Sequence, residues 1–132
     1  MVGIVDILTV INREDPYPHK YVELLVSTVA YDMQFMAKRV SNLLHTINLL
    51  ELSAALEGNI DARMDCMTYK FIFEKFMERL FEASEKIAKF NKDHRISRID
   101  IINILNVNAE IDSKLNKIDP IIDNMRQQAR YM

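Results

Sequence analysis

Apolar residues recur at alternating steps of three and four along the last third of the chain. This period is typical of a helix that packs one face lengthwise against other helices. The a and d positions of the heptad are Ile101, Ile104, Asn108, Ile111, Leu115, Ile118, Ile122, Met125, Ala129 and Met132. We predict a helix over residues 97–131, because Ser97 and Asp100 resemble a capping box with Asp in place of Glu.

The same repeat runs without a break through an earlier part of the chain. Its positions are Val22, Val26, Val29, Met33, Met36, Val40, Leu43, Ile47, Leu50 and Ala54. They predict a first helix over residues 20–57, about 55 Å long at the usual rise per residue. Gly58 follows where a left-handed residue often ends a helix. Further leucines at 25, 44, 49, 52 and 56 widen the stripe and predict contact with at least two neighbours.

A second helix is expected over residues 60–91, with Asn59 or Asp61 as its cap. Its apolar positions are Cys66, Tyr69, Phe73, Phe76, Leu80, Ala83, Ile87 and Phe90. Five of the six phenylalanines lie in this segment. We therefore expect it to be the most buried of the three helices.

Residues 1–19 precede the first long helix. The run 2–11 is apolar and fits a short helix better than a strand, since a strand would have no pairing partner. It either caps one end of the bundle or docks on a partner. Pro16 and Pro18 make residues 13–19 an extended linker.

Pro120 interrupts the C-terminal helix pattern, because it cannot donate a backbone hydrogen bond. Two alternatives remain open. Asp119 and Pro120 start a separate short helix, or one helix bends at Pro120 while the heptad continues. We favour the bent helix, since Pro120 falls at the outward f position.

These segments predict an all-α protein: an elongated up-down-up bundle of three heptad-patterned helices in one domain, residues 1–132. The chain has only two glycines and three prolines, which suits long helices with short turns. No cleavable signal peptide and no membrane-spanning run are evident, and Cys66 is the single cysteine. We expect a cytoplasmic protein, with secretion without a cleaved signal as the open alternative.

Three apolar seams and eight methionines favour partner binding over catalysis. We expect a non-enzymatic adaptor, chaperone or assembly subunit that binds another protein or itself, most simply as a homodimer through the first and third helices. The expected interface is Val29, Met33, Met36, Val40, Asn108, Ile111, Leu115, Ile118, Ile122 and Met125. Asn108 either specifies a partner helix or is satisfied within the chain or by solvent.

Reaction chemistry has little support in the sequence. The three histidines lie in different segments and none follows a Glu-x-x-His pattern, so neither a metal site nor a cofactor is expected. Cys66 occupies a seam position, where a thiol stays protonated and packs as a small apolar group.

Arg39 and His45 have Arg-x5-His spacing, which resembles the loose catalytic pattern of the HEPN family of small all-helical ribonucleases. The resemblance covers these two residues. It implies RNA cleavage with Arg39 and His45 as catalytic residues, an alternative to the binding function.

Basic residues gather around the second turn, at Lys86, Lys89, Lys92, Arg95 and Arg98. They either complement the C-terminal dipole of the second helix and remain solvated, or bind phosphates or an acidic partner. Nucleic-acid binding is the less favoured alternative, because the net charge is −2 and Phe90 is the one aromatic residue among these charges.

Overall fold

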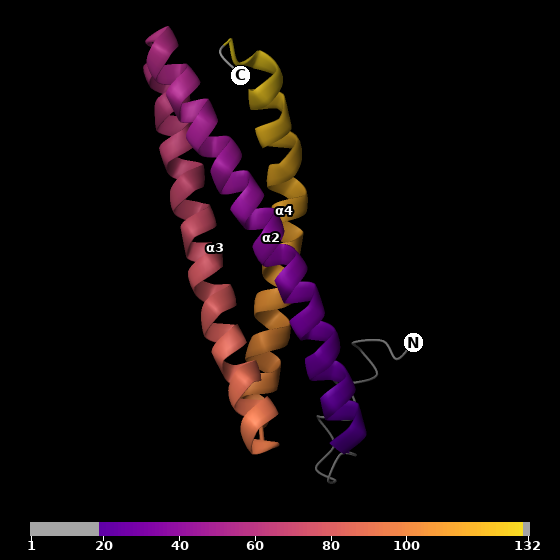
Figure 1. Ribbon diagram of the computed structural model, residues 1–132. Helices are drawn as coiled ribbons and strands as arrows, with labels where there is room; N and C mark the ends of the chain where they lie inside the picture. The colour runs from indigo at the N-terminus through magenta and orange to yellow at the C-terminus, as the bar shows by residue number, and fades with distance from the viewer. Residues whose placement is uncertain (1–18, 131–132) are drawn as a thin grey trace.

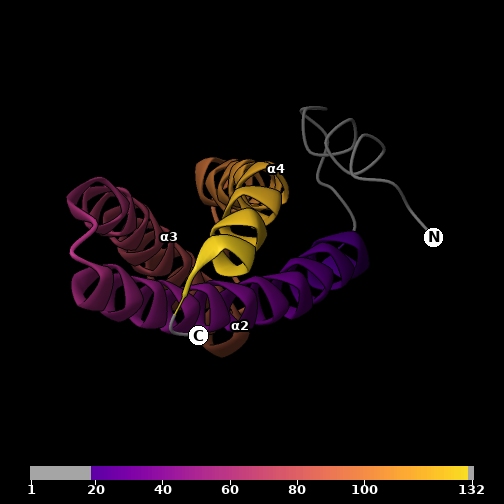
Figure 2. The ribbon, with the colours of Figure 1, turned by 90° about the horizontal axis from the view of Figure 1, so that it is seen from above.

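The fold is a bundle of three long helices, seen in a computed structural model that describes residues 19–130 (Figure 1). The helices are α2 (His19–Glu57), α3 (Ile60–Asp93) and α4 (Arg98–Gln128), and the described residues contain no strand. Successive helices run in opposite directions (Figure 1), and α2 packs against both α3 and α4, which it crosses at an angle (Figure 2). The predicted elongated all-α bundle is confirmed.

The helix boundaries lie within a few residues of those predicted. The first helix begins one residue early, at His19, the second extends to Asp93, and the third ends at Gln128. Predictions for residues 1–18 and for Met132 lie outside the described residues.

The turn between α2 and α3 needs only two residues. Gly58 has a φ of +69°, and its N–H donates to the carbonyl of Ala55 at 3.2 Å. The N–H of Asn59 donates to the carbonyl of Ala54 at 2.9 Å, which completes a Schellman motif. The Asn59 side chain then accepts from the N–H of Ala62 and caps α3. The predicted stop and one of the two predicted caps are therefore confirmed.

The turn between α3 and α4 also contains a left-handed residue that ends one helix and an N-cap that begins the next, but the residue types differ. His94 takes the left-handed position with a φ of 56° and donates its N–H to the carbonyl of Phe90. Ser97 Oγ accepts from the N–H of Asp100 at 3.1 Å, so Ser97 is the predicted N-cap. The Asp100 carboxylate also lies 3.5 Å from Lys86 Nζ on α3. This contact ties the start of α4 to the helix before it.

α4 is one continuous helix through Pro120, and the alternative of a separate short helix is wrong. Pro120 is exposed, whereas Leu115 and Ile122 on either side of it are buried. The missing backbone donor thus lies on the outer side of the helix, where it disturbs packing least.

The core follows the predicted seams, with two corrections. α3 is not the most buried helix, because α2 contributes more buried side chains and because Phe71 and Phe81 of α3 are exposed. Leu49, Leu52 and Leu56 are exposed too, although they were expected to widen the buried stripe of α2. In a three-helix bundle each helix turns one side to the core, and residues on its opposite side meet no further helix.

Candidate functional site

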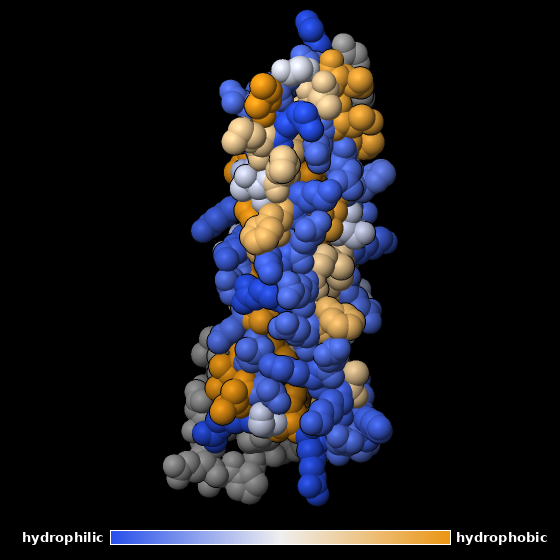
Figure 3. All heavy atoms as spheres, turned by 90° about the vertical axis from the view of Figure 1, so that its left-hand side faces the viewer, coloured by the Kyte–Doolittle hydropathy of each residue, from blue (hydrophilic) through white to orange (hydrophobic). Residues whose placement is uncertain are grey.

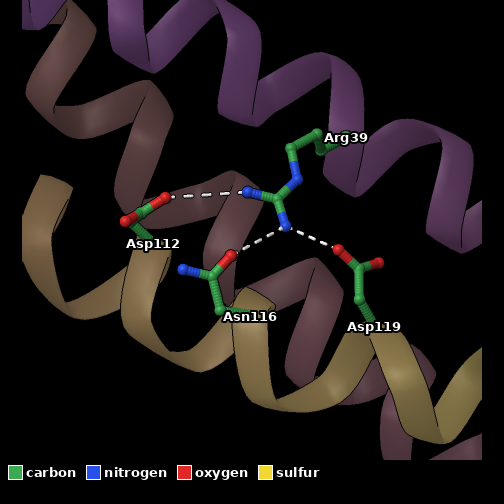
Figure 4. A network of polar contacts seen from close by, with 4 residues as sticks. All are labelled: Arg39, Asp112, Asn116 and Asp119. Carbon is green, nitrogen blue, oxygen red and sulfur yellow. Dashed lines mark hydrogen bonds and ion pairs between the residues drawn. The ribbon is translucent and has the colours of Figure 1, made fainter.

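Arg39 holds α2 against α4 through three side chains (Figure 4). Its Nη2 lies 2.5 Å from Asp119 Oδ2 and 3.3 Å from Asn116 Oδ1. Its Nη1 lies 3.6 Å from Asp112 Oδ1. The three partners are spaced by four and three residues, which places them along one edge of α4. One arginine therefore bridges about two turns of the neighbouring helix.

Asn108 lies one turn before this edge, in the apolar row of α4. The residues one heptad before and after it, Ile101 and Leu115, are 2% and 0% exposed. Asn108 is partly buried, and its Oδ1 is buried without a hydrogen-bond partner. An unsatisfied buried oxygen destabilises a fold by about 1–3 kcal/mol. This oxygen is the one such side-chain atom found in the described part of the chain.

A groove opens between α2 and α4 beside Asn108. It encloses about 590 Å³ and is lined by Tyr31, Asp32, Phe35, Met36, Arg39, Asn108, Ala109 and Asp112. Tyr31 and Phe35 stand at its rim with 71% and 64% of their surface exposed. We call it the α2–α4 groove. It offers two aromatic side chains, the side chain of Asn108 and a charged end at Arg39.

Sequence reasoning picked out Arg39 and Asn108 for unrelated reasons, and the structure brings them to one groove. It missed Tyr31 and Phe35. The signal was their four-residue spacing off the seam, which places two aromatic residues on one side of α2.

The remaining residues of the expected interface pack inside the single chain. Val29, Met33, Met36, Val40, Ile111, Leu115 and Ile122 are buried, and Ile118 and Met125 pack against the core from partly buried positions. In this structure the three helices of one chain therefore bury these seam residues. Met36, like Asn108, also borders the α2–α4 groove.

Arg39 and His45 are not drawn together by the fold. Arg39 reaches across to α4, while His45 is exposed on α2, about 120° further around the helix. The guanidinium of Arg39 is engaged by two carboxylates and an amide. Catalysis at this pair would require Arg39 to leave those contacts.

The basic residues do collect at the end of the bundle where α3 turns into α4. Lys86 is used within the fold, since its Nζ donates to Asn103 Oδ1 at 3.1 Å and pairs with Asp100. Lys89, Lys92, Arg95 and Arg98 are exposed around the turn. Binding of phosphates or of an acidic partner by these residues stays a prediction.

Cys66 is buried, and burial raises the pKa of its thiol, with smaller contributions from Glu51 and Asp65. The thiol is therefore protonated and packs with the core, as its seam position predicts. Within residues 19–130, no three His, Cys, Asp or Glu side chains gather closely enough to hold a metal ion. None of the described helices combines the length and the apolar character needed to cross a bilayer.

Comparison of the chain with protein-family models, with curated proteins and with solved structures found no match.

Proposed function

We propose that this chain is a non-enzymatic helical bundle that acts by binding protein, and that a second copy of itself occupies the α2–α4 groove. The observation that carries this proposal is the unpaired Oδ1 of Asn108 beside a groove with an exposed aromatic rim. A rotation of the Asn108 amide that turns this oxygen toward the groove would let a partner donate a hydrogen bond to it and remove the cost of leaving it unsatisfied.

A second copy suits the chemistry of the groove because an asparagine amide is self-complementary. It carries both a donor and an acceptor, so two Asn108 side chains related by a two-fold axis can satisfy each other. Asparagine pairs of this kind select the register and the number of helices in coiled coils.

The aromatic rim would supply the apolar part of the contact. Tyr31 and Phe35 lie one turn apart and expose most of their rings. Large aromatic side chains bury much surface at little entropic cost and are enriched at interfaces. Arg39 and its α4 partners would keep the two walls of the groove at a constant spacing, as an adaptor, chaperone or assembly subunit requires. The proposal includes a cytoplasmic setting, which suits the single, buried Cys66.

Light scattering over a range of protein concentrations tests this proposal. The wild type is expected to form dimers, and Phe35→Glu is expected to be monomeric because it places a charge in the contact. Phe81→Glu is the matched control, since Phe81 is 64% exposed and lies on a second groove, between α2 and α3. A strict monomer at high wild-type concentration, or equal effects of the two variants, would contradict the proposal.

Asn108→Ile separates the role of the amide from that of the aromatic rim. This variant is expected to form a mixture of dimers and other oligomeric states, because an apolar residue at position 108 allows the paired helices to align in several registers. A single, unchanged oligomeric state would show that Asn108 does not specify the pairing.

A further inference from the structure

A second exposed apolar surface lies on the N-terminal half of α3. Ile60, Met64, Met67 and Phe71 are 71%, 61%, 58% and 60% exposed. Their spacing of four, three and four places them on one side of the helix, opposite the buried Cys66 and Phe73. We call this set the α3 stripe. Figure 3 shows hydrophobic side chains among hydrophilic ones along the upper half of the face where this part of α3 lies.

The α3 stripe has the pattern of a coiled-coil seam. Single exposed apolar residues are common in soluble proteins, but four in one row over three turns form a continuous surface. The row is one residue wide and repeats with the a and d spacing, which is narrower than the apolar side of a helix that packs into a bundle core. Two of the four residues are methionines, which adapt to the shape of a partner.

The charges beside the stripe are positive along one edge and mixed along the other. Arg63 and Lys70 precede the a positions Met64 and Phe71. On the other side, Asp61 follows Ile60 and Lys75 follows Glu74, the acidic residue at the next d position. Lys75 Nζ lies 5.5 Å from the centre of the Phe71 ring and 3.3 Å from Glu78. Arg63 and Lys70 thus form a basic edge along one side of the stripe, whereas Asp61, Glu74 and the Lys75–Glu78 pair leave the other side mixed in charge.

These charges disfavour a second copy on the same stripe. An antiparallel pair would place Arg63 against Lys70 twice, and a parallel pair would place Lys70 against Lys75. Like charges in such positions destabilise a helix pair. An anionic membrane is also disfavoured, because a row one residue wide, with Asp61 beside it, inserts little apolar surface.

We propose that the α3 stripe docks an amphipathic helix of another protein, one with an apolar a/d row flanked by acidic residues. The apolar row would cover Ile60, Met64, Met67 and Phe71, and its carboxylates would meet Arg63 and Lys70. This site is separate from the α2–α4 groove, so the chain could bind a partner while self-associated.

Two synthetic helical peptides test this proposal with the full chain. Both carry Leu at a and d, and one has Glu and the other Lys at all e and g positions. The Glu peptide is expected to bind about tenfold more tightly than the Lys peptide in fluorescence anisotropy, with a difference that shrinks as salt is added. Arg63→Glu combined with Lys70→Glu is expected to reverse the preference.

Met64→Glu combined with Met67→Glu is expected to abolish binding of the Glu peptide. Ile99→Glu, at an isolated residue on α4 that is 78% exposed, is the matched control and keeps binding. Because these side chains are exposed, circular dichroism is expected to show an unchanged helix content for all variants.

Four results would overturn the proposal. They are no binding of either peptide, equal binding of both, binding that survives the double methionine variant, and self-association that this variant removes while Phe35→Glu does not. Binding to vesicles of phosphatidylcholine and phosphatidylserine without peptide binding would assign the stripe to membranes instead. Loss of dimerisation in Phe35→Glu with intact peptide binding concerns the α2–α4 groove and leaves the stripe supported.

Discussion

α4 forms ion pairs on the side that faces α3 and on the side that faces α2, but the two sides differ in the residues next to those ion pairs. Toward α3, Arg79 Nη2 lies 2.7 Å from Glu110 Oε2, Lys114 lies 2.8 Å from the other carboxylate oxygen, and Lys86 reaches Asp100 and Asn103. Toward α2, Arg39 bridges Asp112, Asn116 and Asp119. The α2 side also has a polar residue, Asn108, in the adjoining apolar row of α4, with a groove beside it.

This difference separates two uses of polar residues in one bundle. Charged residues at the rim of a helix contact stay partly hydrated, and they align the helices with little net stabilisation. A polar residue in the core row leaves an unsatisfied group, which a partner can satisfy. The candidate site therefore follows from Asn108 rather than from the more numerous ion pairs.

The largest expected effect comes from removing a core side chain of the same row. Leu115→Ala is expected to lower the free energy of unfolding by about 2–5 kcal/mol, because it leaves a cavity among buried neighbours. Asn108→Ala is expected to lower it far less, since it also removes the unpaired oxygen. Urea denaturation at one protein concentration measures both. Equal losses would show that Asn108 is as well packed as Leu115.

Asn108→Ile is expected to raise the free energy of unfolding by about 1–2 kcal/mol, since an apolar side chain replaces an unsatisfied one. Urea denaturation in the monomeric Phe35→Glu background isolates this effect from dimerisation. Asn103→Ile, on the α3 side, is the matched control and is expected to change stability by less than about 0.5 kcal/mol. A destabilised Asn108→Ile protein would mean that the amide has a stabilising partner.

Replacing Arg39, which bridges α2 and α4, and Arg79, which bridges α3 and α4, compares the ion pairs on the two sides of α4 directly. Arg39→Met and Arg79→Met are each expected to lower the free energy of unfolding by at most about 1 kcal/mol, because partly exposed ion pairs contribute little. Arg39 is expected to have the larger effect, since it contacts three side chains. Both effects are expected to decrease when salt is added. Losses that are unchanged by salt would indicate lost packing rather than lost charge.

Acid is expected to weaken the α3 side through Glu110. The hydrogen bond from Arg79 lowers the pKa of this carboxyl to about 2, with a further contribution from Lys114. The folded state thus favours the charged form, so this stabilisation is present above the ordinary pKa and is lost as pH falls from about 4.5 toward 2. Glu110→Gln is expected to lose less stability over that range, as measured by thermal unfolding. An equally steep loss in the variant would assign the acid sensitivity to other groups.

Much of the fold was predictable from the sequence because its signals are local. The three-and-four spacing located each helix to within a few residues, and Gly58, Asn59 and Ser97 marked their ends through backbone conformation and capping. Cys66 was correctly placed in the core, since a seam position is buried whichever neighbour covers it.

The candidate site was less predictable, because it depends on which helix faces which. Arg39 matched a two-residue catalytic pattern in the sequence, yet the packing of α2 on α4 directs it to three side chains that lie 73, 77 and 80 residues away in the chain. Tyr31 and Phe35 lie off the seam, and their spacing did not reveal that they border a groove. The exposure of Leu49, Leu52 and Leu56 likewise follows from the number of helices, which heptad spacing does not determine.

The sequence by itself determined the three helices, their caps, and the presence of Asn108 in an apolar row. These depend on hydrogen bonds and side-chain periodicity within each segment. Only the tertiary structure decided that Asn108 Oδ1 is buried without a hydrogen-bond partner, that a groove opens beside this residue toward Arg39, and that the α3 stripe is left uncovered. Those features depend on distances between helices, which result from packing the whole chain at once.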